Sequence, residues 1–263
     1  MNYQHQYHAG NFSDVFKHSV LLAIFQYLFQ KEKPFCYLDS HAGKGFYDLS
    51  SQESQATQEW QSGILKIKDA SSKPKIIADY WEIVASCNLD NTLKFYPGSP
   101  MVAEKSLRLI DKMIFVESES TVFSALKNQF KLDKRIVMHQ QDGYRALNAF
   151  LPPKEKRGIV LIDPPYENTN EVDRLCNALN QALKKWPQGI YAIWYPIKRL
   201  QEQPLFIKKI KYVHGEIPAL NTQLLLKKLQ PGLQGCGMYI INPPWQFEKM
   251  LTTFVPWLEE LYS

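Results

Sequence analysis

The run Leu161-Ile162-Asp163-Pro164-Pro165-Tyr166 combines residue types that suit chemistry on the exocyclic amine of a nucleobase. The N6 amine of adenine is a poor nucleophile, because its lone pair is delocalised into the ring. The Asp163 carboxylate and the Pro164 carbonyl can accept its two hydrogens, and neither proline has an N–H that would compete. Tyr166 supplies a flat face on which a flipped base can stack. We therefore predict that Asp163 is catalytic and that Pro164 and Tyr166 contact the substrate; a Pro-rich turn that only ends a strand is the alternative.

A second run, Ile241-Asn242-Pro243-Pro244-Trp245, has the same form, with an amide in place of the carboxylate and Trp in place of Tyr. It follows what looks like a terminal hairpin. We expect it to be structural, because two prolines end a strand before the last helix. A supporting role in the substrate pocket is the alternative.

An acid and a short Gly-x-Gly loop follow another β-prone run, in Tyr37-Leu38-Asp39-Ser40-His41-Ala42-Gly43-Lys44-Gly45. Such a loop lets backbone approach a cofactor closely. It lacks the full G-x-G-x-x-G fingerprint of nicotinamide dinucleotide sites and the GK[ST] ending of a phosphate-binding P-loop, so it argues against both.

Two further acids come at the ends of later β-prone runs. Glu117 stands where such folds hold ribose hydroxyls, and Asp142, with the adjacent backbone N–H of Gly143, could read an adenine amino group. Taken singly, each acid could equally cap a helix N-terminus. Together with Asp39 and Asp163, they predict a cofactor site at one edge of a sheet.

Four histidines, His5, His8, His18 and His41, lie near probable loop ends. They raise a metal hypothesis, but no cysteine accompanies them and no HExxH pairing occurs. We expect no metal. These polar aromatic residues are expected to line a pocket, with His5 and His8 neutral or transiently charged near RNA phosphates.

A parallel sheet is needed to bring these residues together. Short apolar runs alternate with helical stretches, and continuous apolar strands are typical of parallel sheets buried on both faces. The expected strands cover residues 35–39, 112–117, 135–139, 158–163 and 189–195. The expected helices cover residues 13–28, 118–130, 143–150 and 168–186. Ser13-Asp14 offers an N-cap and a first-turn acid for the first of them. This βαβ succession predicts an α/β fold with a doubly wound, Rossmann-like sheet.

Two segments depart from this alternation. Residues 49–95 contain helical stretches at 59–68 and 76–87, and a connection of this length should have structure of its own. We therefore expect a main domain over residues 1–48 and 96–263 and an inserted helical subdomain over residues 49–95. The last part of the chain predicts two antiparallel strands, at 216–226 and 237–242, and a final helix at 246–262.

The composition excludes several classes of protein. The 263 residues are 45% hydrophobic and 22% charged, which rules out a disordered or collagen-like chain. No uncharged apolar run reaches the roughly 20 residues that cross a bilayer, and no cleavage site follows the apolar stretch 20–29. Four separated cysteines without a CxxC favour reduced thiols, hence a cytoplasmic protein. A net charge of +5 permits a polyanionic partner without requiring one.

Several motifs occur together along nearly the whole chain. They are Tyr3-x-His5-x-x-His8-Ala9-Gly10-Asn11-x-x-Asp14-Val15-x-Lys17-His18, Leu38-Asp39-x-His41-Ala42-Gly43, Tyr96-Pro97-Gly98-Ser99-Pro100, Trp194-Tyr195-Pro196 and the two Pro-Pro runs. The set resembles the RlmJ family, bacterial methyltransferases that use S-adenosyl-L-methionine to modify one adenine N6 of 23S ribosomal RNA.

The resemblance implies a role for particular residues. The S-adenosyl-L-methionine contacts would be His18, His41, Ser99, Glu117, Asp142, Gly143 and Asp163. Asp163 would also be catalytic, and Tyr3 would touch the RNA. The helical insertion matches the family as well, whereas Lys44 departs from the small residue usual within the Gly-x-Gly loop.

The expected function is methylation of adenine N6 in 23S ribosomal RNA, free or in an early assembly intermediate, by a monomer that binds no membrane. A DNA adenine-N6 methyltransferase is one alternative, although it would normally need a target-recognition region larger than this insertion. A protein methyltransferase acting on glutamine would carry Asn-Pro-Pro-Tyr, and a non-catalytic RNA-binding factor would not need the full set of acids. For RNA contacts we expect Lys198-Arg199 and the basic residues of the insertion, because both should flank the edge where the base enters.

Overall fold

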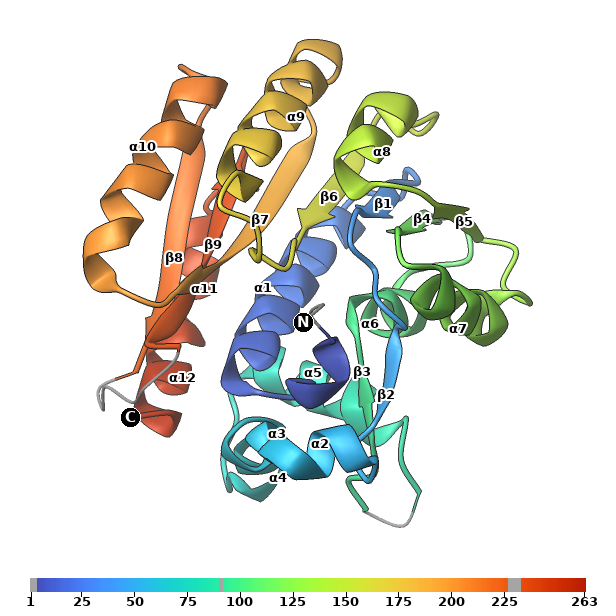
Figure 1. Ribbon diagram of the computed structural model, residues 1–263, viewed down its shortest axis with the longest axis vertical. Coiled ribbons are helices and arrows are strands. Elements are labelled where there is room, and N and C mark those ends of the chain that lie inside the picture. Colours follow the sequence, from blue (N-terminus) through green and yellow to red (C-terminus); the bar gives the residue numbers. More distant parts are fainter. Residues whose placement is uncertain (1–3, 90–91, 227–232) are drawn as a thin grey trace.

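The computed structural model describes residues 4–89, 92–226 and 233–263 (Figure 1). Tyr3, which we expect to touch RNA, lies outside the described residues. The described part forms a seven-stranded sheet in the order β5-β4-β1-β6-β7-β9-β8. Its strands are β1 (Cys36–Asp39), β4 (Lys112–Glu117), β5 (Ile136–Gln140), β6 (Gly158–Ile162), β7 (Ile190–Ile197), β8 (Ala219–Leu225) and β9 (Gly235–Ile241).

The direction of the strands confirms the predicted sheet. β5, β4, β1, β6 and β7 run parallel to one another. β9 runs antiparallel to both of its neighbours, β7 and β8. The terminal hairpin is therefore present, and its second strand, rather than its first, extends the parallel part of the sheet.

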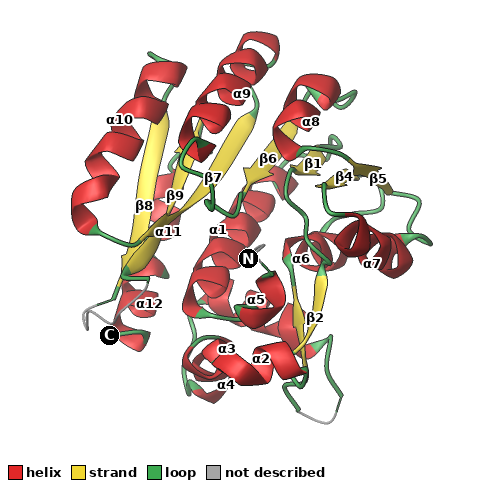
Figure 2. Ribbon diagram, in the orientation of Figure 1, coloured by secondary structure: helices red, strands yellow, loops and turns green. Residues whose placement is uncertain are grey.

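Helices cover both faces of this sheet (Figure 2). Side chains alternate along each strand, so that Ile159 and Leu161 of β6 enter one core while Val160 and Ile162 enter the other. The first core is covered by α1 (Phe12–Phe29), α6 (Ser99–Ser106), α7 (Ser120–Phe130), α11 (Phe247–Leu251) and α12 (Val255–Leu261). The second is covered by α8 (Gly143–Phe150), α9 (Glu171–Lys185) and α10 (Gln203–His214). Burial on both faces explains the continuous apolar runs of the sequence.

The helical segment after the first strand lies between the strands of a small antiparallel sheet, β2 (Phe46–Asp48) and β3 (Phe95–Pro97). Its helices are α2 (Gln52–Thr57), α3 (Glu59–Ser62), α4 (Ile64–Asp69) and α5 (Lys75–Ala85), of which α5 packs against α1. The single helix expected over 59–68 is interrupted at Gly63. There the Ile64 N–H donates to the carbonyl of Gly10 at 2.8 Å, which ties this turn to the N-terminal segment.

Other local predictions were wrong in detail. The N-cap of α1 is Asn11, whose side chain accepts the N–H of Asp14, and not Ser13, whereas Asp14 is the acid of the first turn, as expected. The expected final helix is divided into α11 and α12, and Pro256 stands in the first turn of α12, where a missing N–H does no harm. Helices α6 and α10 and the short helix η2 (Leu200–Glu202) were not predicted from the sequence. Within the described residues, no helix has the length and apolar character needed to cross a membrane.

The N-terminal segment docks onto the inserted helices. It contains the short helix η1 (His5–Tyr7), in which the Gln6 side chain donates to Ser54 Oγ at 2.8 Å and to the Asp48 carbonyl at 2.9 Å. Next to it, His8 Nδ1 lies 2.8 Å from Glu59 Oε1. The hydrogen bond with Glu59 raises the pKa of His8 above its ordinary value of 6.5.

This pair should make stability depend on pH. Because the pKa of His8 is higher in the folded chain, the pair stabilises the fold fully below about pH 6.5 and loses its effect as pH rises through the raised pKa. His8→Ala should therefore lower the melting temperature at pH 6 and have a smaller effect at pH 9, measured by circular dichroism. Glu59→Gln should show the same trend; an equal loss at both pH values would contradict it.

Candidate active site

The carboxyl ends of β1, β4 and β6 meet at one edge of the sheet. Asp39, the last residue of β1, is aligned with Phe115 of β4 and with Leu161 of β6. Glu117 and Asp163 come two residues farther along their own strands. The fold thus brings together three of the acids that the sequence analysis singled out, at the edge where open α/β sheets bind ligands.

The Asp-Pro-Pro-Tyr run forms a turn directly after β6. Pro164 is buried, and Tyr166 is half-buried with a left-handed backbone, at φ +51°. This conformation is unfavourable for a tyrosine, and such strain persists where surrounding contacts fix it. Here the Tyr166 hydroxyl donates to the carbonyl of Trp194 at 2.7 Å, and its ring lies 6.0 Å from the Trp194 ring. The turn is therefore held in one shape beside β7.

The carboxylate of Asp163 is bound by a lysine from α1. Lys17 Nζ lies 2.6 Å from Asp163 Oδ2 and 2.8 Å from Asp14 Oδ1. The second oxygen of Asp14 accepts from the Gly10 N–H at 3.0 Å and lies 2.9 Å from His5 Nε2. Residues of the N-terminal motif thus lie directly behind the expected catalytic carboxylate.

Burial strengthens the electrostatic attraction between the charged groups of this cluster. Lys17 and Asp14 expose 6% and 3% of their side chains, and Asp163 exposes 17%. Although burial opposes charge on both groups, their mutual attraction and the other charges of the cluster prevail. The pKa of Asp14 is held well below its usual range and that of Lys17 well above it. Lys17 therefore remains a cation that fixes the position of the Asp163 carboxylate.

Lys17 was not predicted to be a site residue. A usable signal was present, because Lys17 follows Asp14 by three residues in a helix that is otherwise apolar. A charged pair in such a helix must be buried, and a buried pair needs further partners. The pattern does not reveal that the partner comes from residue 163, which is 146 positions away.

The Gly-x-Gly loop places backbone against Glu117. The N–H of Gly43 donates to Glu117 Oε2 at 3.0 Å, and the other oxygen of Glu117 accepts from the N–H of Glu119 at 2.9 Å. Gly43 has φ +62°, and a Cβ on it would lie 2.5 Å from the Tyr47 hydroxyl. Both the backbone conformation and the space require glycine there.

His41 and Gly143 lie next to each other at the same edge. The His41 ring packs edge-on against Tyr144, with the ring centres 5.2 Å apart, and its Nδ1 is 2.8 Å from Ser40 Oγ. Burial lowers the pKa of His41 to about 4, so that it is neutral at pH 7. Asp142, which precedes Gly143, caps α8 by accepting the Arg145 N–H and also pairs with Arg174 at 2.5 Å. Both oxygens of Asp142 thus have partners in this structure.

Gly143 leaves no room for a side chain. A Cβ on it would lie 2.1 Å from the carbonyl oxygen of Ser40 and 2.8 Å from His41 Cε1. Gly143→Ala should therefore destabilise the fold by roughly 1–3 kcal/mol, the usual cost of overpacking, and weaken cofactor binding. Urea unfolding and a cofactor titration would measure both. Asn148→Ala, on the exposed side of the same helix, is the control; equal effects of both changes would contradict the prediction.

Ser99 and His18 lie deeper. The Ser99 hydroxyl donates to Asp39 Oδ2 at 2.6 Å, and the Tyr37 hydroxyl donates to the same oxygen at 2.7 Å. Burial raises the pKa of Asp39 to about 6. His18 is fully buried beside Tyr96, with its Nδ1 3.0 Å from the Tyr96 hydroxyl, and burial lowers its pKa to about 3. His18 Nε2 has no hydrogen-bond partner among the described residues.

The second Pro-Pro run lies at the opposite edge of the sheet. Because β9 is antiparallel to β7, its last residue, Ile241, pairs with Tyr191 near the start of β7. Asn242 follows there, and its amide is 3.4 Å from the Gly189 carbonyl, while Trp245 is 79% exposed. The run is therefore structural, as expected, and it cannot reach Asp163.

The histidines do not assemble a metal site. No group of three or more His, Cys, Asp or Glu side chains within the described ranges is arranged to hold a metal ion. His5 and His8 lie near different acids, Asp14 and Glu59, and His18 lies in the core.

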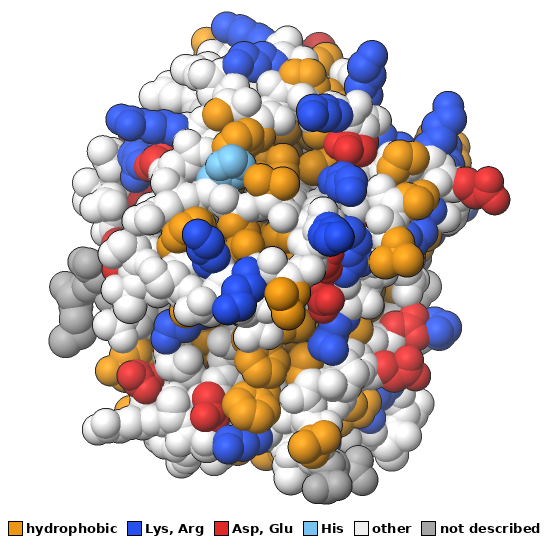
Figure 3. Space-filling model, turned by 90° about the vertical axis from the view of Figure 1, so that its right-hand side faces the viewer, with side chains coloured by type: hydrophobic (Ala, Val, Ile, Leu, Met, Phe, Trp, Pro, Cys, Tyr) orange, Lys and Arg blue, Asp and Glu red, His pale blue; other side chains and the backbone are white. Residues whose placement is uncertain are grey.

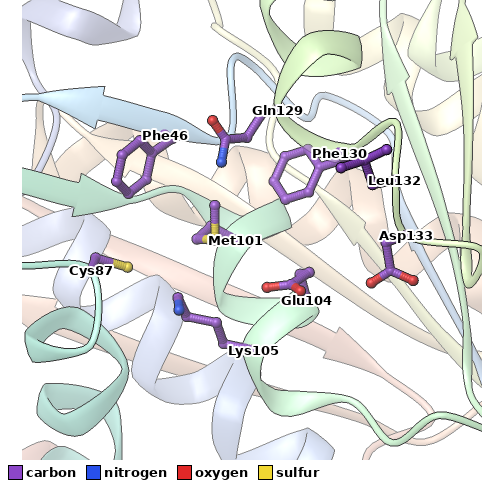
Figure 4. Close-up of a pocket in the computed structure, with 9 residues that line it drawn as sticks. All are labelled: Phe46, Cys87, Met101, Glu104, Lys105, Gln129, Phe130, Leu132 and Asp133. Carbon is purple, nitrogen blue, oxygen red and sulfur yellow. The ribbon is translucent and has the colours of Figure 1, made fainter.

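A separate pocket lies behind the Gly-x-Gly loop (Figure 4). Its lining residues are Phe46, Cys87, Met101, Glu104, Lys105, Gln129, Phe130, Leu132 and Asp133. None of them is an expected site residue. Phe130 lines this pocket and also packs against the Gly-x-Gly loop, because a Cβ on Gly45 would lie 2.6 Å from its ring. Asp39, Glu117, Asp142 and Asp163 do not line this pocket.

The sheet edge fits the expected cofactor. Lys17 is the cation that Asp14 and Asp163 share, whereas Asp39 accepts hydrogen bonds from hydroxyl groups and Glu117 from backbone N–H groups. Such an excess of negative charge favours a ligand that carries a sulfonium. The unpaired Nε2 of His18 leaves one polar group for a nucleoside.

Comparisons with known proteins agree with these features. The family model described as "Ribosomal RNA large subunit methyltransferase D, RlmJ" matches residues 32–263. "Ribosomal RNA large subunit methyltransferase J" of Haemophilus influenzae is 38% identical over 261 residues, which cover 98% of this chain and 92% of that protein. The protein of that name from Escherichia coli is 35% identical over 259 residues, with the same coverage. A crystal structure of a Legionella pneumophila protein, 34% identical, superposes with a TM-score of 0.90 over 97% of this chain and 94% of that one.

Proposed function

The chain belongs to the RlmJ family of ribosomal RNA large subunit methyltransferases, and we propose that it methylates the exocyclic N6 of one adenine in 23S ribosomal RNA. The observation that carries the choice of N6 is the Asp163 carboxylate, which directly follows β6, pairs with Lys17 and precedes Tyr166 by three residues. A carboxylate acceptor in the same turn as an aromatic ring suits the amine of a nucleobase. An asparagine in place of Asp163 would instead suit the side-chain amide of a glutamine substrate.

Each residue of the turn has a distinct task. Asp163 and the Pro164 carbonyl accept the two hydrogens of the amine and direct its lone pair, and Tyr166 stacks the base. Lys17 holds the Asp163 carboxylate in its orientation. Most of the rate comes from this positioning, because it turns a reaction between two molecules into one within a single complex.

The cofactor is S-adenosyl-L-methionine, which supplies a methyl group already activated on a sulfonium. We propose that its contacts are His18, His41, Ser99, Glu117, Asp142, Gly143 and Asp163. Glu117 would hold the ribose hydroxyls, the site typical of an acid that ends the second strand of such a sheet. Asp142 already caps α8, so the backbone N–H groups at the start of α8 would contact the cofactor together with the Asp142 side chain.

We further propose the division of the chain into a methyltransferase domain, residues 1–48 and 96–263, and an inserted helical subdomain, residues 49–95. The small β2–β3 sheet at the base of the insertion supports these boundaries. The protein would act as a monomer in the cytoplasm, on free RNA or an early assembly intermediate, with Tyr3 against the RNA and without a metal. Sedimentation with and without RNA would test the monomer.

Transfer of labelled methyl from S-adenosyl-L-methionine to 23S ribosomal RNA tests the function. The RNA should come from cells that lack this protein, with genomic DNA and assembled large subunits in parallel. Label recovered as N6-methyladenosine at one site of free RNA is expected. Label only on DNA would overturn the choice of RNA, and no label on any nucleic acid, with the cofactor bound, would overturn the proposed reaction.

A further inference from the structure

The second half of β7 runs beyond the edge that carries Asp163. β7 pairs with β6 only as far as Ile193, opposite Ile162, whereas residues 194–197 pair with β9 alone. At roughly 3.3 Å per residue, this extension carries the end of β7 about 13 Å past the last residue of β6. The residues that follow therefore stand beside the active-site edge and beyond it, where β7 turns into α10 (Figure 1).

An aromatic wall joins this end of β7 to the turn that would stack the base. The rings of Tyr195 and Phe206 lie 4.6 Å apart, and Phe206 meets the ring of Tyr166 edge-on at 6.3 Å. Tyr166 also donates a hydrogen bond to the backbone of β7, so the wall and the turn are joined by two kinds of contact. Tyr195 is only 2% exposed, so the wall lies mainly inside the protein and fixes the end of β7 relative to the turn.

Four side chains project at the end of the wall, and we call them the tip: Lys198, Arg199, Leu200 and Leu205. All four are exposed, Leu200 by 46% and Leu205 by 63%. Arg199 approaches Glu202 at 3.4 Å, but both side chains are largely in solvent, so this pair is weak and a phosphate can replace it. Two cations beside two exposed leucines suit a partner that has both charge and apolar faces.

We propose that the tip docks the RNA strand that flanks the target adenine, an inference that rests on the proposed function. Lys198 and Arg199 bind phosphates next to the flipped nucleotide. Leu200 and Leu205 contact the neighbouring bases, which lose a stacking partner when the adenine leaves the stack; apolar side chains fill such gaps in other complexes. The extension of about 13 Å spans a few nucleotides of a strand, so both kinds of contact fall on the same RNA segment.

Positive charge alone does not select the tip. Figure 3 shows the side of the molecule that faces away from α10, and Lys and Arg side chains are present there too, dispersed among hydrophobic and acidic ones. The tip differs because it directly follows β7, whose residue Tyr195 contacts Phe206, and Phe206 in turn contacts Tyr166. Phosphates bound at the tip belong to the segment that carries the target base.

A pair of double variants tests the proposal. Lys198→Ala with Arg199→Ala removes two charges from the tip. Lys154→Ala with Lys184→Ala removes two exposed charges from the opposite edge of the sheet, before β6 and at the end of α9. Binding of protein-free 23S ribosomal RNA is measured by filter retention over a range of KCl concentrations, together with kcat and KM for methyl transfer. Lys198→Arg with Arg199→Lys keeps the charge, and cofactor titration and melting temperature check that each variant folds.

The tip variant should bind RNA about tenfold more weakly and raise KM with little change in kcat, while the slope of log affinity against log salt falls by about 0.7–0.9 for each lost contact. The control pair and the charge-keeping variant should match the wild type. Leu200→Ser with Leu205→Ser should slow transfer on a hairpin RNA more than on a single strand. Equal effects of the tip and control pairs, or unchanged affinity in the tip variant, would overturn the proposal. A wild-type protein that binds RNA but methylates none would instead overturn the proposed function.

Discussion

Asp163→Ala should reduce methyl transfer to RNA by roughly 10²- to 10⁴-fold, the range lost when a group that handles a proton in the transition state is removed. The variant lacks the acceptor that orients the amine and retains the Pro164 carbonyl and the Tyr166 face. Single-turnover transfer of labelled methyl, at saturating RNA and cofactor, is the measurement.

Two further variants show which property of Asp163 matters. Asp163→Asn keeps one acceptor oxygen and loses the charge, so a rate between those of the wild type and the alanine variant would separate positioning from proton handling. Asn242→Gly changes the similar run at the opposite edge, tolerates the φ of +57° there, and should leave the rate unchanged. Cofactor affinity should stay within about threefold in the three variants, because several other residues share that contact. Full activity of Asp163→Ala would refute the assignment.

Lys17→Met should damage both activity and stability. The substitution leaves the carboxylates of Asp14 and Asp163 without their shared cation, and removal of one partner of a buried ion pair typically costs about 3–5 kcal/mol. Urea unfolding at pH 7 would measure this loss. Methyl transfer should also fall at least about tenfold, because Asp163 loses the contact that fixes its orientation.

The double variant Lys17→Met with Asp163→Asn distinguishes the two effects. Removing the charge at residue 163 relieves part of the uncompensated negative charge, so this variant should be more stable than Lys17→Met alone. Its activity should stay as low as that of the single Asp163→Asn variant or lower. Additive losses of stability would mean that Lys17 and Asp163 do not interact in solution.

The alternation of apolar runs and helical stretches was sufficient to predict the parallel part of the sheet. Continuous burial leaves a signal in each strand, because both faces must be apolar, and this signal is local in the sequence. The strand ends in turn located Asp39, Glu117 and Asp163, since parallel strands of one sheet finish at the same edge. The short helices were harder to predict: α3 and α4 are separated by a contact with Gly10, and no local pattern marks that contact.

The sequence by itself determined which residues have the chemistry and that Asp163 follows a buried strand. The tertiary structure decided what surrounds them. It joined Lys17 to Asp163 across 146 positions, buried His18, engaged Asp142 with Arg174 and placed Asn242 at the far edge. The physical reason is that charge pairing, burial and the antiparallel insertion of β9 are properties of the packed chain, in which residues distant in sequence share one low-dielectric environment.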